Sequence, residues 1–139
     1  MEREYLNQTL REAIIFRDLE NVRDSLAEGA DINGCDWDGW TPLHIAAFEG
    51  LIAHVELILE TTDVDCNVQN VDGNTPLQVA SLKRNLELVQ VLLERTVKDP
   101  NKVNEFGNTP LHSAAEDGHL PIVQLLLERT DTDPNKVNE

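Results

Sequence analysis

The chain has 139 residues, of which 40% are hydrophobic and only 4% aromatic, and its formal charge is −15. Abundant aliphatic residues with few aromatic ones favour packed helices over a β-sandwich built on large side chains. The formal charge of −15 argues strongly against the basic surface that nucleic acids require and disfavours binding to anionic membranes; a basic partner, or simple solubility, fits better.

The N-terminal segment MEREYLNQTLREAIIF mixes both charge signs and lacks the apolar stretch and cleavage site of a signal peptide. Further along, no segment reaches the roughly 18 consecutive apolar residues of a membrane-spanning helix. We therefore expect neither a secretory leader nor a membrane anchor in these residues.

Four similar units follow one another along the chain. The tripeptide Thr41-Pro42-Leu43 returns at residues 75–77 and 109–111, 34 residues apart each time. We place the units at about residues 1–34, 35–68, 69–102 and 103–136, with a tail at 137–139. Unit one lacks the tripeptide but keeps four apolar positions of the pattern: Leu10, Ala13, Val22 and Leu26. Such a unit cannot bury its apolar face alone, so a fixed period predicts a stack.

The beginning of each unit predicts a short helix with defined ends. Thr41 is a good N-cap because its hydroxyl can accept a backbone N–H of the first turn. Pro42 follows at the first helical position, where its missing N–H costs nothing. Gly50 suits a left-handed C-cap.

The rest of each unit predicts a longer second helix and a loop. In unit two the second helix is indicated by the apolar residues between Val55 and Leu59. The pairs Asp38-Gly39 and Asp72-Gly73 predict tight turns at the tips of hairpins.

Three in-phase motifs carry a family resemblance. They are D-x-D-G-W-T-P-L-H-x-A-A-x-x-G at 36–50, N-x-D-G-N-T-P-L-Q at 70–78 and N-E-F-G-N-T-P-L-H-S-A-A-E-D-G-H at 104–119. On these motifs the chain resembles the ankyrin repeat family over nearly its full length. The resemblance implies an all-α solenoid of stacked helix-turn-helix units with β-hairpin tips.

Unit three departs from the family pattern. Gln78 stands where the family usually has His, and Arg84-Asn85 replaces the Gly-His pair that closes the first helix. A non-glycine residue in a left-handed cap costs on the order of 1 kcal/mol, so we expect unit three to be a weak link. Unit four places Phe106 where the other tips have a turn aspartate.

The two ends of the array also differ in sequence. Unit one is rich in charged residues, as expected of a cap whose outer side faces water. Unit four keeps the apolar residues of an interior unit: Leu120, Ile122, Val123, Leu126 and Leu127. We expect either that the array continues or that a partner or a second copy covers this end.

The histidines are expected to be structural. His44 and His112 belong to the T-P-L-H frame, in which the family's histidine makes a structural hydrogen bond. We expect His119 to be a bridging residue and His54 to be half-buried by packing. None lies at a metal-ligand spacing, so no metal site is expected.

No other group indicates catalysis. "DWDG" at 36–39 and "DVDCN" at 63–67 resemble calcium loops faintly, but the twelfth position counted from Asp36 is Ala47, not glutamate. Cys35 and Cys66 occupy non-equivalent positions of the units, which disfavours a disulfide scaffold, and Cys66 reads as a small core residue. We expect no enzyme and no cofactor, and a reducing intracellular compartment: the cytoplasm, or alternatively the nucleus or a host-cell cytosol.

The resemblance implies a protein partner bound by the hairpin tips and the exposed side of the first helices. On this sequence the tips contribute Trp37, Trp40, Val71, Asn74, Glu105, Phe106 and Asn108. The first helices contribute Phe48, Glu49, Leu82, Lys83, Glu116 and Asp117. An aromatic patch on unit two that grades into an acidic end suits a partner with an apolar anchor and a basic flank.

Several alternatives stay open. Trp40, Phe48 and Phe106 could instead pack against a neighbouring hairpin and stiffen the stack. The leading function is a non-catalytic interaction module. The alternatives are the ankyrin portion of a larger enzyme or of a secreted bacterial effector, a small kinase-inhibitor-like ankyrin protein, or a spacer without a partner. A monomer and a self-associating chain are both compatible with the sequence.

Overall fold

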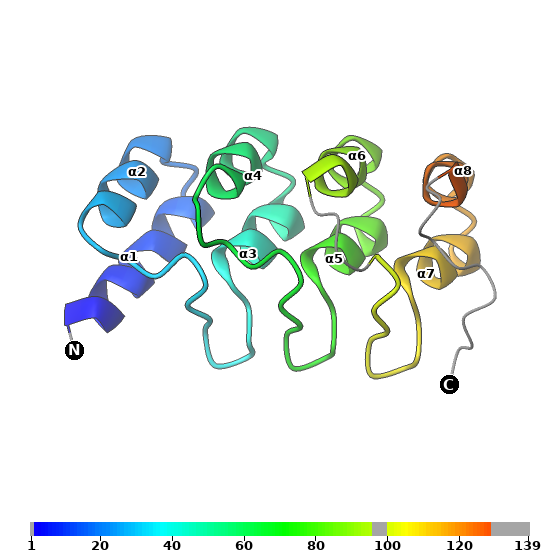
Figure 1. Ribbon diagram of the computed structural model, residues 1–139, viewed down its shortest axis with the longest axis horizontal. Helices are drawn as coiled ribbons and strands as arrows, with labels where there is room; N and C mark the ends of the chain where they lie inside the picture. The colour runs from blue at the N-terminus through cyan, green and yellow to red at the C-terminus, as the bar shows by residue number, and fades with distance from the viewer. Residues whose placement is uncertain (1, 96–99, 129–139) are drawn as a thin grey trace.

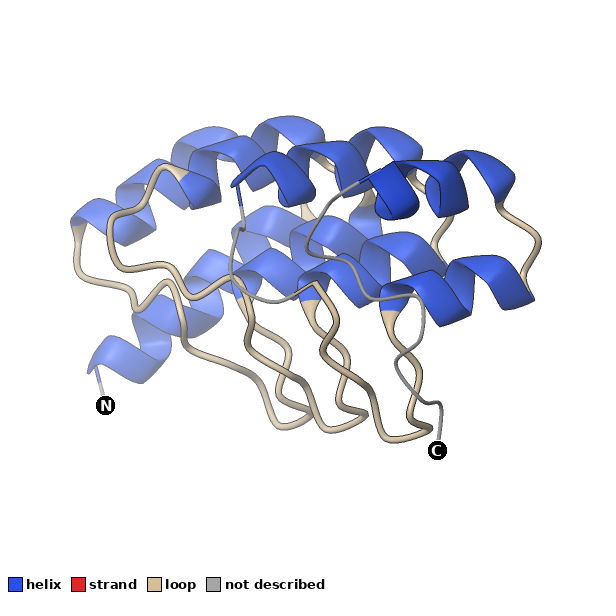
Figure 2. Cartoon of the chain, turned by 45° about the vertical axis from the view of Figure 1, so that its right-hand side comes forward, coloured by secondary structure: helices blue, strands red, loops and turns tan. Residues whose placement is uncertain are grey.

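The computed structural model describes residues 2–95 and 100–128, and in them the chain forms two layers of helices (Figure 1). The first helices of the four units form one row: α1 (Glu2–Ile15), α3 (Pro42–Glu49), α5 (Pro76–Leu82) and α7 (Pro110–Glu116). The second helices form a row above it: α2 (Leu19–Ala27), α4 (Ile52–Leu59), α6 (Leu86–Arg95) and α8 (Leu120–Glu128). The loops between units project below the first row, away from the second helices (Figure 2). The predicted all-α stack of paired helices is confirmed.

The predicted helix starts are confirmed in three units. The Thr41 hydroxyl accepts the N–H of His44 at 3.4 Å, and His44 Nδ1 accepts the N–H of Thr41 at 3.2 Å, which closes a capping box. Unit four repeats this box with Thr109 and His112. Because these bonds join residues only three apart, the local sequence suffices to predict them.

The ends of the first helices share one backbone conformation. Gly50 (φ 72°) and Gly118 (φ 73°) adopt the left-handed region, where glycine carries no steric penalty. Arg84 adopts it as well (φ 63°), as predicted, and Arg17 (φ 62°) does the same in unit one. Two units therefore make the turn between their helices with an L-residue that disfavours it.

The relative lengths of the helices were only partly predicted. In units three and four the second helix is the longer, whereas α3 and α4 both have 8 residues. In unit one the order is reversed, because α1 has 14 residues and α2 has 9. Unit one has no Thr-Pro start, so nothing in the local sequence confines its first helix to two turns.

Each helix pair buries its apolar face against its neighbours. The first helices lie close together because Ala46, Ala80 and Ala114, all fully buried, present only a methyl group at the contact. One continuous core of aliphatic residues runs from Leu10 to Leu126. The stack therefore stabilises units that could not fold singly.

The hairpin tips are held by backbone pairing within and between units. In unit three the N–H of Asn70 donates to the carbonyl of Asn74 at 3.0 Å. Adjacent tips are joined where Val71 N–H donates to the Asp38 carbonyl at 3.0 Å. A side chain on Gly73 (φ 78°) would lie 2.8 Å from a backbone nitrogen of the next tip, so this turn needs glycine for conformation and for space. The described residues contain this pairing without a regular strand (Figure 2).

The C-terminal side of unit four exposes apolar residues. Ile122 and Leu126 of α8 are buried, whereas Leu120 and Leu127 are exposed. Unit four thus has the interior-type pattern that its sequence predicts, and the prediction of what covers this end remains a prediction. No helix among the described residues has both the length and the apolar character needed to cross a bilayer.

Candidate functional site

The thirteen residues predicted to bind a partner are called here the inner surface. They lie on the hairpin tips, which lead into the N-terminal ends of α3, α5 and α7, and at or just after the C-terminal ends of the same helices. Figure 2 shows the tips below this row of helices. Trp37, Val71 and Glu105 occupy equivalent positions at successive tips, and all three are exposed. Trp37 is the extreme case, with an exposed fraction of 101%.

The aromatic residues of unit two form a partly buried cluster. The ring of Trp40 lies edge-on to Phe48, with 5.5 Å between centroids, and 5.8 Å from the ring of His44. The Lys83 Nζ lies 4.3 Å above the Phe48 ring, a cation–π contact from the next unit. For Trp40, exposure to a partner and packing were both left open by the sequence; the ring is half-buried because Phe48 and His44 lie against it, which favours packing.

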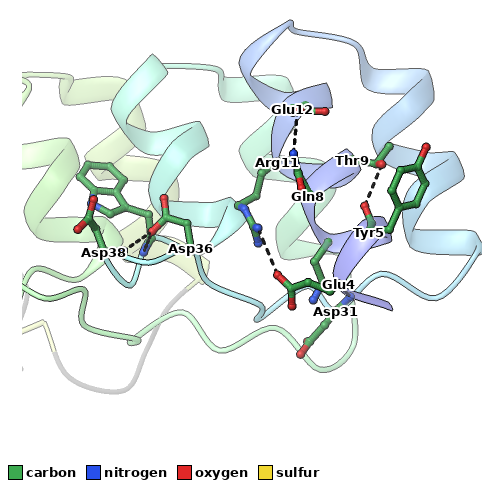
Figure 3. A network of polar contacts seen from close by, with 11 residues as sticks. Glu4, Tyr5, Gln8, Thr9, Arg11, Glu12, Asp31, Asp36 and Asp38 are labelled. Carbon is green, nitrogen blue, oxygen red and sulfur yellow. Dashed lines mark hydrogen bonds and ion pairs between the residues drawn. The ribbon is translucent and has the colours of Figure 1, made fainter. Parts of the chain in front are cut away.

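Trp37 lies apart from this cluster. It lines a groove of about 330 Å³ with Glu4 and Arg11 of α1 and with Asp36 of its own tip. Figure 3 shows this region, with Arg11 paired to Glu4 at 3.9 Å beside the tip that carries Asp36. The predicted single aromatic patch is therefore two separate features, the exposed Trp37 and the cluster of Trp40 with Phe48.

A second groove, of about 350 Å³, lies between the tips and first helices of units three and four. It brings together seven of the thirteen predicted residues: Asn74, Leu82, Glu105, Phe106, Asn108, Glu116 and Asp117. Asp72, Asn104 and Ser113 complete its lining. We call it the acidic groove, since four of its ten lining residues are carboxylates.

Asparagine side chains fix the shape of this groove. Asn104 Oδ1 accepts the N–H groups of Phe106 at 2.9 Å and Asn108 at 3.0 Å. Asn104 Nδ2 donates to Asn74 Oδ1 of the preceding tip at 3.1 Å. The tips are thus held by side chain-to-backbone bonds that leave the outward side chains available for binding.

The comparison with protein families agrees with this architecture. The family of ankyrin repeats in three copies matches residues 10–104 and 55–138. The chain belongs to the ankyrin repeat family. Ankyrin repeats generally serve as protein–protein interaction modules, and the matched residues are ankyrin repeats alone.

One curated relative adds a partial match. The chain is 42% identical over 48 residues to Protein VAPYRIN-LIKE of Medicago truncatula. This stretch covers 34% of the present chain and 10% of that protein, so the chain spans only a small part of the relative's length.

The histidines of the ankyrin T-P-L-H frame have the expected structural role. Nδ1 of buried His44 accepts a backbone N–H, so its proton is on Nε2, which donates to the carbonyl of Asn74 at 2.8 Å. This bond ties helix α3 to the tip of unit three. Burial lowers the pKa of His44 and so keeps the ring neutral. The hydrogen bond to the Asn74 carbonyl raises the pKa and offsets part of this effect.

Two other histidine predictions need correction. His54 was expected to be half-buried, but its exposed fraction is only 5%. Burial and the nearby Arg17 guanidinium both lower the pKa of His54. His119 was expected to be a bridging residue, but its side-chain Nε2 makes no hydrogen bond among the described residues. Its backbone carbonyl accepts the N–H of Val123 at 2.9 Å at the start of α8.

The cysteines and acidic loops form no recognisable centre. Cys35 is exposed, and Cys66 is half-buried against the core as predicted. Residues 2–95 and 100–128 contain no group of three or more His, Cys, Asp or Glu side chains that could hold a metal ion.

Sequence reasoning missed some features of the surface. Gln78 replaces the framework histidine, and its Nε2 donates to the hydroxyl of Ser113 at 2.7 Å, across to unit four. The pairing could have been suspected because Ser113 stands where units two and three have Ile45 and Val79. The exposed aromatic rings of Tyr5 and Phe16 were also missed, since unit one has no tip motif to place them.

Proposed function

We propose that this ankyrin array is a non-catalytic module that binds a partner protein through its inner surface. The observation that carries the proposal is the exposure of apolar side chains along successive tips: Trp37 is fully exposed, Phe106 is 64% exposed and Val71 is exposed too. Exposed apolar groups gathered on one side of a protein mark interaction sites, since solvent exposure gives them no stabilising role.

Trp37 is the best candidate for an anchor. Its tip is held by Asp36, whose carboxylate accepts the N–H groups of Asp38 at 2.9 Å and Trp40 at 3.0 Å, so the tip does not depend on the Trp37 ring. A tryptophan buried at the centre of an interface contributes about 2 kcal/mol or more. The exposure of Trp37 is therefore best explained by a partner.

The charge of the chain defines the class of partner. A protein with an apolar anchor and basic flanking residues complements a chain of net charge −15, whereas nucleic acid and anionic membranes do not. We further propose an intracellular location, since Cys35 is an exposed thiol of the kind that a reducing compartment tolerates.

Affinity capture with variants tests the proposal. The chain is immobilised as wild type, as Trp37→Ala and as Tyr5→Ala, and proteins bound from a lysate of the source organism are quantified by mass spectrometry. Tyr5 is a matched control because it is 70% exposed and, in Figure 3, lies on the side of α1 away from the first tip. A partner recovered with the wild type and Tyr5→Ala but lost with Trp37→Ala is expected. Equal recovery with all three would refute the proposal.

A further inference from the structure

The acidic groove combines a hydrophobic floor with charged walls. Leu82 at the end of α5 is 42% exposed, and Phe106 at the tip of unit four faces the same groove. Leu82 is the last residue of α5, whereas Leu77 and Ala80 of the same helix are buried in the core. The floor thus offers apolar area that the folded chain leaves in contact with water.

The walls carry uncompensated negative charge. Asp72 and Glu105 stand on the tip side, whereas Glu116 and Asp117 stand on the helix side, and all four are exposed. Among the described residues, no lysine or arginine pairs with any of them. Lys102, close to Glu105 in sequence, donates instead to the carbonyl of Asn67 at 3.0 Å, and Lys83 lies over the Phe48 ring.

The groove beside Trp37 provides an internal comparison. There Arg11 lines the groove together with Glu4 and Asp36, and its guanidinium is paired with Glu4 (Figure 3). The chain therefore places a cation in its first groove and none in the acidic groove. A basic side chain of a partner would complement the carboxylates of the acidic groove, which has no cation of its own among its lining residues.

The size of the groove limits what it can hold. Its volume of about 350 Å³ is near the lower end for ligand pockets, which accommodates one or two side chains of a peptide rather than a domain. Its walls are pre-formed, because the Asn104 hydrogen bonds already fix the tip. Binding to a rigid groove costs less conformational entropy than binding to a mobile one.

Resting on the proposed function, we propose that the acidic groove binds a short linear segment of the partner in which one apolar residue lies between basic residues. The apolar side chain is seated between Leu82 and Phe106, and the arginine or lysine side chains reach the carboxylates of the two walls. This contact is separate from that of Trp37, which engages a different part of the partner.

A peptide titration tests this assignment on the full chain. The probe is a short fluorescein-labelled peptide with one leucine between two pairs of basic residues, and binding is followed by fluorescence anisotropy. We expect saturable binding that weakens about tenfold with the double substitution Glu116→Gln/Asp117→Asn, because two wall charges are lost. Removing acids from the C-terminal end of α7 does not oppose helix formation, so this variant folds.

A matched control separates the groove from the overall charge. Glu56→Gln/Glu60→Gln makes the same change in net charge at the end of α4, in the other row of helices, at two exposed positions. It should change the affinity by less than about twofold. A peptide in which glycine replaces the leucine should bind the wild-type chain more weakly than the original peptide does. The original peptide should likewise bind the Phe106→Ala variant more weakly than it binds the wild-type chain.

The outcomes distinguish this inference from the wider proposal. Equal weakening by the two double variants would overturn the groove assignment, since the peptide would then be responding to net charge alone. Absence of saturable binding would overturn it too, and Trp37-dependent capture would be unaffected by that result. Conversely, peptide binding at the groove without any Trp37-dependent partner would refute Trp37 as the anchor and leave the groove assignment standing.

Discussion

Replacing Arg84 with glycine should stabilise the array. Arg84 is exposed, has a positive φ of 63° and takes part in no ion pair among the described residues. Its backbone N–H donates to the Ser81 carbonyl at 3.1 Å, a bond that glycine retains. The substitution therefore removes a strained conformation without removing a tertiary contact that depends on the side chain.

The expected gain follows from two opposing effects. An L-residue in the left-handed region costs roughly 1–2 kcal/mol relative to glycine. Glycine enlarges the conformational freedom of the unfolded chain, which costs about 0.4–1 kcal/mol. Arg84→Gly should accordingly raise the free energy of unfolding by about 0.5–1 kcal/mol, or the melting temperature by about 2–5 °C.

Urea denaturation followed by far-UV circular dichroism measures this change. Gly118→Ala is the matched control, because it makes the reverse change, from glycine to an L-residue, at the equivalent position of unit four. Gly118 occupies the same place in unit four (φ 73°), and a Cβ there would meet no atom within 4 Å, so only the backbone conformation is tested. Gly118→Ala should destabilise the chain by about the amount that Arg84→Gly stabilises it. A loss of stability with Arg84→Gly would refute the reasoning and the view of unit three as a weak link.

Three further predictions concern stability. The double substitution Gln78→His/Ser113→Ala should raise the melting temperature by a few degrees. The histidine restores the capping box with Thr75, and the alanine removes the Ser113 hydroxyl, which otherwise loses its hydrogen bond from Gln78. An unchanged melting temperature in calorimetry would contradict this prediction. Trp40→Ala should cost about 2–3 kcal/mol, because it removes a half-buried ring packed edge-on against Phe48, whereas Trp37→Ala should cost less than about 0.5 kcal/mol; equal losses in urea titrations would contradict the burial difference. Burial lowers the pKa of His44, so below about pH 6.5 the unfolded chain binds a proton that the folded chain does not bind. The contribution of His44 to stability is therefore complete above that pH and is lost as the pH falls toward the folded pKa. His44→Gln should reduce the drop in unfolding free energy between about pH 7.5 and 5.5, and an identical drop in both proteins would disprove this link.

The parts of the fold that local chemistry determines could be predicted from the sequence. Thr41 caps a helix through a residue three positions away, and Gly50 and Arg84 turn the chain within one or two residues, so their neighbours in sequence already define their roles. The repeat period then gives the stack, because identical faces at a fixed interval pack on one another.

The parts that depend on tertiary contacts could not be predicted in the same way. Within unit two, Trp40 is half-buried because the ring of Phe48, near the far end of α3, lies against it, and Lys83 reaches Phe48 from another unit. Likewise, the acidic groove arises only when the tips and first helices of units three and four are placed side by side. A motif identifies which residues are at a tip, whereas their burial depends on side chains from later in the same unit and from the neighbouring unit.

Site-specific photo-crosslinking tests the central claim, partner binding by the inner surface, most directly. A photoreactive phenylalanine analogue is placed at Trp37, at Phe106 and, as controls away from the inner surface, at Tyr5 and at Leu86 of α6, all of which are exposed. We predict that positions 37 and 106 crosslink to the same partner polypeptide while positions 5 and 86 do not. Crosslinking of a partner from Tyr5 or Leu86 alone would contradict the account.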